Sequence, residues 1–112
     1  MIANHNEISN VVVVIDRNMI QSLGSTEETL KLEPFEEKWK AFGWKVRTID
    51  GHSHLELFQA LENVEGPLCI IANTTKGKGV PFMENSVLWH YKFPSDVEVA
   101  QGISYVRGIY ER

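Results

Sequence analysis

Short apolar runs alternate along the chain with segments of helical periodicity. Val11–Asp16 places five β-branched residues in succession, and Leu68–Ala72 is continuously apolar. Runs without alternation predict strands that are covered on both faces, as in a parallel sheet. Trp44–Ile49 predicts a further strand, between these two in sequence.

The first predicted helix follows a polar loop that extends from Arg17 to about Thr26. Pro34 lies near the start of this helix and Gly43 at its end, as helix boundaries favour. Its apolar residues recur at helical spacing and are expected to face the core: Leu32, Phe35, Trp39 and Phe42.

Two more helices are predicted. The second follows the Asp50-Gly51 turn, and Ser53 and Glu56 have the spacing of a capping box. The last helix is expected to be capped by Ser95 and to run toward Tyr110. The second helix is expected to bury an apolar stripe of Leu55, Phe58 and Leu61.

The order of these elements predicts an α/β fold, a parallel-sheet fragment (βαβαβ) followed by a C-terminal helix. Residues 1–112 are enough for one domain at most. Ligands of open parallel sheets bind beyond the carboxyl ends of the strands. The loops after Asp16 and after Ala72 are therefore expected to carry the chemistry.

Composition excludes several classes of function. The net charge is −4 and the basic residues are dispersed, so no basic stripe is available for nucleic-acid binding. Cys69 is the only cysteine, which excludes an intrachain disulfide and favours a small buried side chain. No apolar run is long enough to span a membrane and no signal-peptide pattern is present, so a cytoplasmic protein is expected.

The loop after the first strand offers oxygen ligands for a metal ion. The side-chain carbonyl of Asn18 and a backbone carbonyl two residues on, at Ile20, suit an octahedral cation such as Mg²⁺ when phosphate oxygens complete the coordination. The alternative is that Asn18 is a turn residue, which is the commoner role of asparagine after a strand.

The loop after the third strand has the sequence Lys76-Gly77-Lys78-Gly79. Glycines such as Gly77 let the backbone approach a ligand, and successive N–H groups can cradle an anion. The spacing differs from that of a P-loop. A solvated basic turn is the alternative interpretation.

A histidine follows in an otherwise irregular stretch, within Trp89-His90-Tyr91-Lys92. His90 beside a lysine can contact phosphate or transfer protons near neutral pH. The alternative is a surface histidine that is held by aromatic packing.

Four stretches in collinear order resemble the diphosphate-binding domain of transketolases, and they cover nearly the whole chain. The resemblance implies a thiamine-diphosphate-binding fold. The stretches are Val12–Asn18 with Gly24–Glu28, Leu32–Trp44, Ile49–His52, and Thr75–Val80 with Phe82–Asn85 and Trp89-His90.

The resemblance also implies roles for individual residues. Asn18 matches the asparagine that ends the family's cofactor motif and binds Mg²⁺, and Ile20 falls where a backbone carbonyl completes that coordination. The resemblance implies a catalytic role for His90. In the family, thiamine diphosphate carries out two-carbon ketol transfer between sugar phosphates in the pentose phosphate pathway. The positions expected to line the cofactor diphosphate and substrate channel are Lys76, with Gly77 beside it, His90 and Lys92.

The sequence departs from the family pattern in several places. The Gly-Asp-Gly that opens the family's cofactor motif and supplies its metal carboxylate is not found in the chain. Arg17 stands where family members often have Asn or Asp, Met19 replaces a commonly small or polar residue, and Leu23 replaces a frequent Asp. The chain is therefore expected to be part of a domain, with a strand edge that complementing chains or self-association would cover.

Three functions remain open at this point. The chain can be part of a transketolase that is inactive alone, a non-catalytic scaffold fragment that self-associates or binds a partner, or a phosphate-binding module without thiamine specificity. We expect the isolated chain to have no transketolase turnover, so two-carbon transfer by the purified chain would contradict this expectation.

Overall fold

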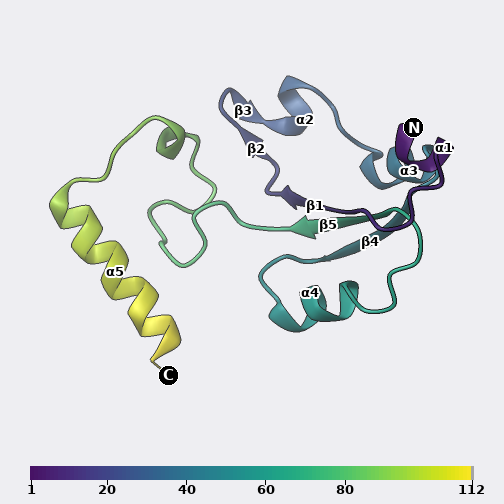
Figure 1. Ribbon diagram of the computed structural model, residues 1–112. Coiled ribbons are helices and arrows are strands. Elements are labelled where there is room, and N and C mark those ends of the chain that lie inside the picture. Colours follow the sequence, from purple (N-terminus) through teal and green to yellow (C-terminus); the bar gives the residue numbers. More distant parts are fainter. Residues whose placement is uncertain (112) are drawn as a thin grey trace. The chain divides into compact units, whose positions relative to one another are not determined.

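The computed structural model describes residues 1–111, so only Arg112 of the expected domain lies outside the described residues (Figure 1). The described chain forms two compact units. Unit 1 comprises residues 1–18 and 30–74, and unit 2 comprises residues 19–29 and 75–111 of the described part.

Unit 1 is built on a three-stranded parallel sheet, which confirms the predicted sheet. The strands are β1 (Val12–Arg17), β4 (Lys45–Asp50) and β5 (Leu68–Asn73), and their order in the sheet is β1-β5-β4. Leu68 is aligned with Val12 on one side and with Lys45 on the other. Each strand continues one residue beyond the predicted carboxyl end, to Arg17, Asp50 and Asn73.

The core of unit 1 lies along β5, because this strand has a neighbour on both sides. All residues from Leu68 to Ala72 are buried, as their continuous apolar pattern predicts. Ala60, Leu68 and Ile70 form one cluster, with Ile49 and Val64 packed against it. Burial raises the pKa of the Cys69 thiol to about 11, so this cysteine is an inert core residue.

The prediction that β1 is covered on both faces is wrong for the described residues. Its side chains alternate, with Val12 37% and Val14 54% exposed, while Val13 and Ile15 are half-buried. β1 is an edge strand of the sheet, so it has one neighbour only. A run of β-branched residues identified the strand, but it did not reveal whether a second layer covers the outer face.

Unit 1 has three helices among its described residues, α1 (Ile2–His5), α3 (Phe35–Ala41) and α4 (His54–Ala60). The two that the sequence predicted, α3 and α4, begin close to the expected residues. α3 starts directly after Pro34, and Gly43 follows its end with φ +81°, a left-handed conformation that suits glycine. Leu32 precedes the helix instead of lying within it, and Phe42, which caps it, is 49% exposed.

The predicted buried stripe of α4 is wrong. Leu55, Phe58 and Leu61 are between 52% and 65% exposed, and the helix instead turns Ala60 toward the sheet. The capping prediction is half confirmed. Ser53 Oγ accepts the Glu56 N–H at 3.2 Å, but the Glu56 carboxylate reaches the Asp50 N–H, at 2.8 Å, instead of returning to Ser53.

The described residues of unit 2 form two helices, a 3₁₀ turn and a small hairpin, and the sequence did not predict the hairpin. The hairpin strands, β2 (Ile20–Gln21) and β3 (Gly24–Ser25), lie within the segment predicted as a loop. α5 (Asp96–Tyr110) starts with the capping box of Ser95 and Glu98, which confirms the predicted last helix. The other elements are α2 (Thr26–Thr29) and the 3₁₀ turn η1 (Val87–His90).

The helices within residues 1–111 are short or polar by the standard of membrane spans. In this part of the chain, none is long and apolar enough to cross a bilayer.

Candidate functional site

Hydrogen bonds tie the carboxyl ends of the three parallel strands together. The Thr74 hydroxyl donates to the Asp16 carboxylate, and the Thr74 N–H donates to the Arg17 carbonyl at 3.2 Å. On the other side of β5, the Gly51 N–H donates to the Asn73 carbonyl at 2.8 Å. These bonds hold the edge of the sheet at which ligands of parallel α/β proteins bind.

Asn18 is the residue that directly follows β1 at this edge, and it is half-buried. Asn18 belongs to unit 1, while the other predicted site residues belong to unit 2: Ile20, Lys76, Gly77, His90 and Lys92.

Arg17, which precedes Asn18, is a residue whose importance the sequence reasoning missed. Its side chain is buried and forms an ion pair with Glu33 at 3.0 Å. The signal in the sequence was an arginine directly after the apolar run and Asp16, because a charge that is buried at a strand end needs a partner.

Ile20 lies on β2, opposite Ser25 of β3. The neighbouring pair, Met19 and Thr26, is hydrogen-bonded, because the Thr26 N–H donates to the Met19 carbonyl at 2.9 Å. In an antiparallel ladder, hydrogen-bonded pairs alternate with pairs that are not hydrogen-bonded. Ile20 and Ser25 form a pair of the second kind, so the backbone carbonyl of Ile20 is directed away from Ser25. The carbonyl oxygen expected to bind a metal is thus on the outer side of the hairpin.

Three consecutive backbone N–H groups at the end of the loop, those of residues 78–80, are bonded within the chain. The Lys78 N–H donates to the Thr75 carbonyl at 3.1 Å, and the Val80 N–H donates to Gly77 at 3.0 Å. The Gly79 N–H donates to the carboxylate of Glu84 at 3.0 Å. An anion thus already occupies one of the donors expected to cradle phosphate, and it is a carboxylate of the chain itself.

Gly77 has a steric role in this loop. Its φ is +77°, and a Cβ at this position would lie 2.7 Å from the carbonyl oxygen of Met83. The Asn85 N–H donates to the Lys76 carbonyl at 3.0 Å, which fastens the same turn from the other side. Glycine at 77 therefore lets the segment from Met83 to Asn85 pack against the backbone that carries Lys76.

His90 and Lys92 lie at the end of η1 and just beyond it, both with exposed side chains. The Tyr91 hydroxyl donates to the Ser22 carbonyl at 3.0 Å, and this bond brings the segment beside the hairpin of Ile20. Unit 2 thus gathers two of the predicted regions, the hairpin and the His90 segment.

The Lys92 ammonium group already has partners within unit 2. It forms an ion pair with Glu98 and lies 4.5 Å from the centre of the Trp89 ring. A diphosphate that binds Lys92 would have to compete with Glu98 for the charge.

This ion pair predicts a pH dependence at the start of α5. The hydrogen bond from Lys92, together with those from Ser95, lowers the pKa of Glu98 from its ordinary value of 4.5 to about 2. A carboxylate with a lowered pKa stabilises the fold above its ordinary pKa, and this contribution is lost as the pH falls from about 4.5 through about 2. The Ser95 N–H donates to Glu98 at 2.8 Å and reports on it.

We expect the Ser95 amide signal in NMR spectra to titrate with a midpoint near 2, and Glu98→Gln to abolish this titration. A midpoint near 4.5 in the unchanged chain would show that Lys92 does not hold Glu98 in solution. Lys92→Met should move the midpoint toward the ordinary value, because it removes the hydrogen bond that lowers the pKa of Glu98 most.

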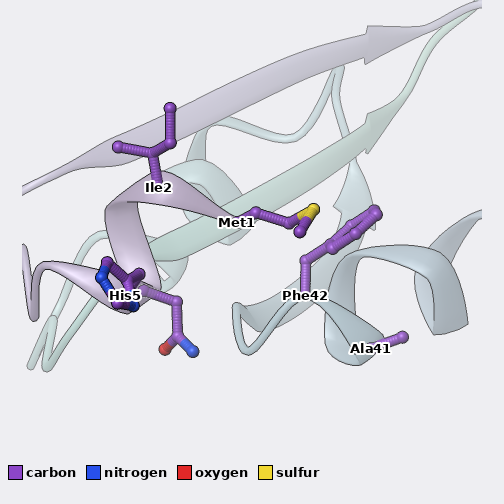
Figure 2. A pocket seen from close by; sticks show the side chains of 6 residues that line it. Met1, Ile2, His5, Ala41 and Phe42 are labelled. Atoms are coloured by element: carbon purple, nitrogen blue, oxygen red, sulfur yellow. The ribbon is translucent and has the colours of Figure 1, made fainter.

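A pocket of about 590 Å³ lies elsewhere in unit 1, between α1 and the end of α3. Figure 2 shows the side chain of Met1 directed toward the Phe42 ring across this pocket. α1 and α3 lie at the starts of the strand arrows in Figure 1, at the end of the sheet opposite Asn18. The residues lining it are Met1, Ile2, Asn4, His5, Ala41 and Phe42.

The candidate residues provide some of the groups that a magnesium diphosphate needs. Asn18 and Ile20 offer neutral oxygen atoms of the kind that Mg²⁺ accepts, and Lys76 offers a positive charge. Within residues 1–111, no group of three or more His, Cys, Asp or Glu side chains could hold a metal ion. A metal that binds Asn18 of unit 1 or Ile20 of unit 2 would thus depend on further ligands from the cofactor or from other chains.

Comparisons with known proteins agree on one family. The sequence profile described as "Transketolase, thiamine diphosphate binding domain" matches residues 1–103. One of the subunits of apulose-4-phosphate transketolase from Phocaeicola vulgatus is 34% identical over 110 residues, which is 95% of this chain and 39% of that protein. A 6-deoxy-6-sulfo-D-fructose transketolase subunit of a Clostridium species is 39% identical over 94 residues, which is 80% of this chain and 34% of that protein.

A solved structure is similar as well. The crystal structure of transketolase from Campylobacter jejuni matches with a TM-score of 0.67 over 97% of this chain and 21% of that chain. Its sequence identity is 22%, so this likeness supports the fold. The chain spans well under half the length of each of these relatives.

Proposed function

Because the chain belongs to the transketolase family, through its thiamine diphosphate binding domain, we propose that it contributes part of a thiamine diphosphate and Mg²⁺ site for ketol transfer between sugar phosphates. The observation that supports this most directly is the position of Asn18. It follows β1 at the carboxyl edge of the parallel sheet, where the Thr74 bonds fix the strand end.

Each proposed residue has a defined task. Asn18 and Ile20 would bind the metal ion through oxygen atoms, and Lys76 would balance the charge of the diphosphate. His90, which is exposed, would hold or transfer a proton. Lys92 would contribute its charge only when the diphosphate displaces Glu98. When bound, thiamine diphosphate supplies the carbon chemistry, while the protein binds and orients it.

We further propose that residues 1–112 are part of one cofactor-binding domain and act with complementing transketolase chains. Two relatives are named as transketolase subunits, and the chain corresponds to a third or so of each. Exposed apolar side chains such as Leu23 (78%) and Phe93 (91%) are consistent with surfaces that a partner covers. The chain is accordingly expected to lack turnover when it is alone.

The test of this proposal is the binding of thiamine diphosphate with Mg²⁺, measured by titration calorimetry on the purified chain. We expect Asn18→Ala to weaken binding by about tenfold or more, since a metal ligand is lost. Asn10→Ala is the matched control, because Asn10 is an exposed asparagine just before β1, at the other end of the same strand. This variant should bind as the unchanged chain does.

Other results would contradict the proposal. Equal binding by the Asn18→Ala and unchanged chains would remove Asn18 from the site. A folded chain that binds no thiamine diphosphate would favour the scaffold function instead. Binding of sugar phosphates without binding of thiamine diphosphate would favour a phosphate-binding module.

A further inference from the structure

The environment of Arg17 is unusual for a charged residue. Among residues 1–111, the charged residue that is buried is Arg17, which is 4% exposed. Its Nη2 atom donates to Glu33 Oε1 at 3.0 Å, and its guanidinium carbon lies 5.6 Å from the centre of the Phe35 ring. Burying a charge is costly unless it is paired, so these contacts are a condition for Arg17 to occupy this place.

Glu33 is itself held at the start of α3. Its second carboxylate oxygen, Oε2, accepts the Phe35 N–H at 2.8 Å. One carboxylate thus connects Arg17 with the first turn of the helix. Such a bridge restricts the Arg17 side chain more than a flexible surface ion pair would.

The backbone of Arg17 is fastened on its other side. Its carbonyl accepts the Thr74 N–H at 3.2 Å, and Arg17 is aligned with Asn73 in the ladder between β1 and β5. The last residue of β1 is therefore held by α3 through its side chain and by β5 through its backbone. Asn18 is the next residue in the chain.

We propose that Arg17 is a positioning residue, whose ion pair with Glu33 fixes the end of β1 and thereby directs the side chain of Asn18 toward the cation. This inference rests on the proposed function, in which Asn18 is a ligand of the metal ion. The planar guanidinium both pairs with the carboxylate and lies over the Phe35 ring, and a lysine ammonium does not reproduce this geometry.

The experiment uses the whole chain and two NMR measurements, with no ligand present. The first is hydrogen exchange at the Thr74 amide, which bonds to Arg17, compared with the Leu68 amide, which forms the equivalent bond to the Val11 carbonyl at the other end of β1. The second is the order parameter of the Asn18 side-chain NH₂ group. The variants are Arg17→Met, Arg17→Lys and Glu33→Gln.

Loss of the ion pair should act locally. We expect Arg17→Met and Glu33→Gln to speed exchange at Thr74 by about tenfold relative to Leu68, and to lower the Asn18 order parameter below about 0.6. Arg17→Lys should give an intermediate effect, because it keeps the charge and loses the planar guanidinium. The double variant Arg17→Met with Glu33→Gln should add little to either single change.

Two results would overturn the inference. One is equal acceleration at Thr74 and Leu68, which indicates a general loss of stability. The other is an unchanged order parameter at Asn18. Glu33 is 55% exposed, so Glu33→Gln decides the matter even if Arg17→Met fails to fold.

Cofactor binding separates this inference from the function on which it rests. In titrations of Mg²⁺ with thiamine diphosphate, Glu33→Gln should weaken binding, although it alters no proposed ligand. If the unchanged chain does not bind, the proposed function fails, while the exchange and order measurements still show whether Arg17 orients Asn18.

Discussion

Replacing Ile70 with alanine is expected to lower the free energy of unfolding by about 2–5 kcal/mol, which is the range for removing a buried isoleucine side chain. Ile70 is fully buried on β5, between the neighbouring strands β1 and β4. It belongs to the cluster with Ala60 and Leu68, so its removal leaves a cavity at the centre of the unit 1 core. Urea unfolding followed by circular dichroism measures the loss.

Val14→Ala is the matched control for this prediction. Val14 is aligned with Ile70 across the sheet, but 54% of it is exposed. Because little of its side chain is removed from solvent, we expect a change below about 1 kcal/mol. A loss at Val14 as large as that at Ile70 would mean that the face of β1 is covered in solution, by self-association for example. Repeating the measurement at several protein concentrations would reveal this.

Gly77→Ala is expected to be the most disruptive single change in unit 2. Its φ of +77° costs a residue with a side chain about 1–2 kcal/mol. The new Cβ would in addition lie 2.7 Å from the Met83 carbonyl oxygen, so the backbone must move. We expect a total loss of about 2–4 kcal/mol, with faster exchange at the Asn85 amide, which bonds to Lys76.

Gly66→Ala separates the two causes of this loss. Gly66 has φ +76°, and apart from its chain neighbours no heavy atom of the described residues lies within 4 Å of the position that its Cβ would take. This variant should therefore show the conformational cost alone, about 1–2 kcal/mol. If the two variants lose the same stability, contact with Met83 is unimportant. If Gly77→Ala reduces cofactor binding and Gly66→Ala does not, the turn at Gly77 positions Lys76 for the cofactor.

The elements that local patterns define were predicted well. Val11–Asp16 and Leu68–Ala72 are strands within one residue at each end, because β-branched and continuous apolar runs favour extended backbone. Ser95 begins the last helix, because its hydroxyl and the Glu98 carboxylate satisfy the N–H groups that a helix start leaves open. These signals operate over a few residues.

Predictions that concerned which face is covered were less successful. The exposed stripe of α4 and the exposed side of β1 both have apolar sequences. Periodicity indicates which side chains share a face, but the neighbour that covers a face comes from a distant part of the chain or from another chain. The hairpin at Ile20 was missed because strands of two residues leave no periodic signal.

The sequence by itself determined the parallel α/β fragment, its family and the candidate residues Asn18, Lys76 and His90, because runs, caps and motifs are local in the chain. Only the tertiary structure decided how charges pair: Arg17 with Glu33, Lys92 with Glu98, and Gly79 N–H with Glu84. Such pairs depend on the folded path of the backbone. A charged side chain can find its partner only after the strands and loops have brought the two together.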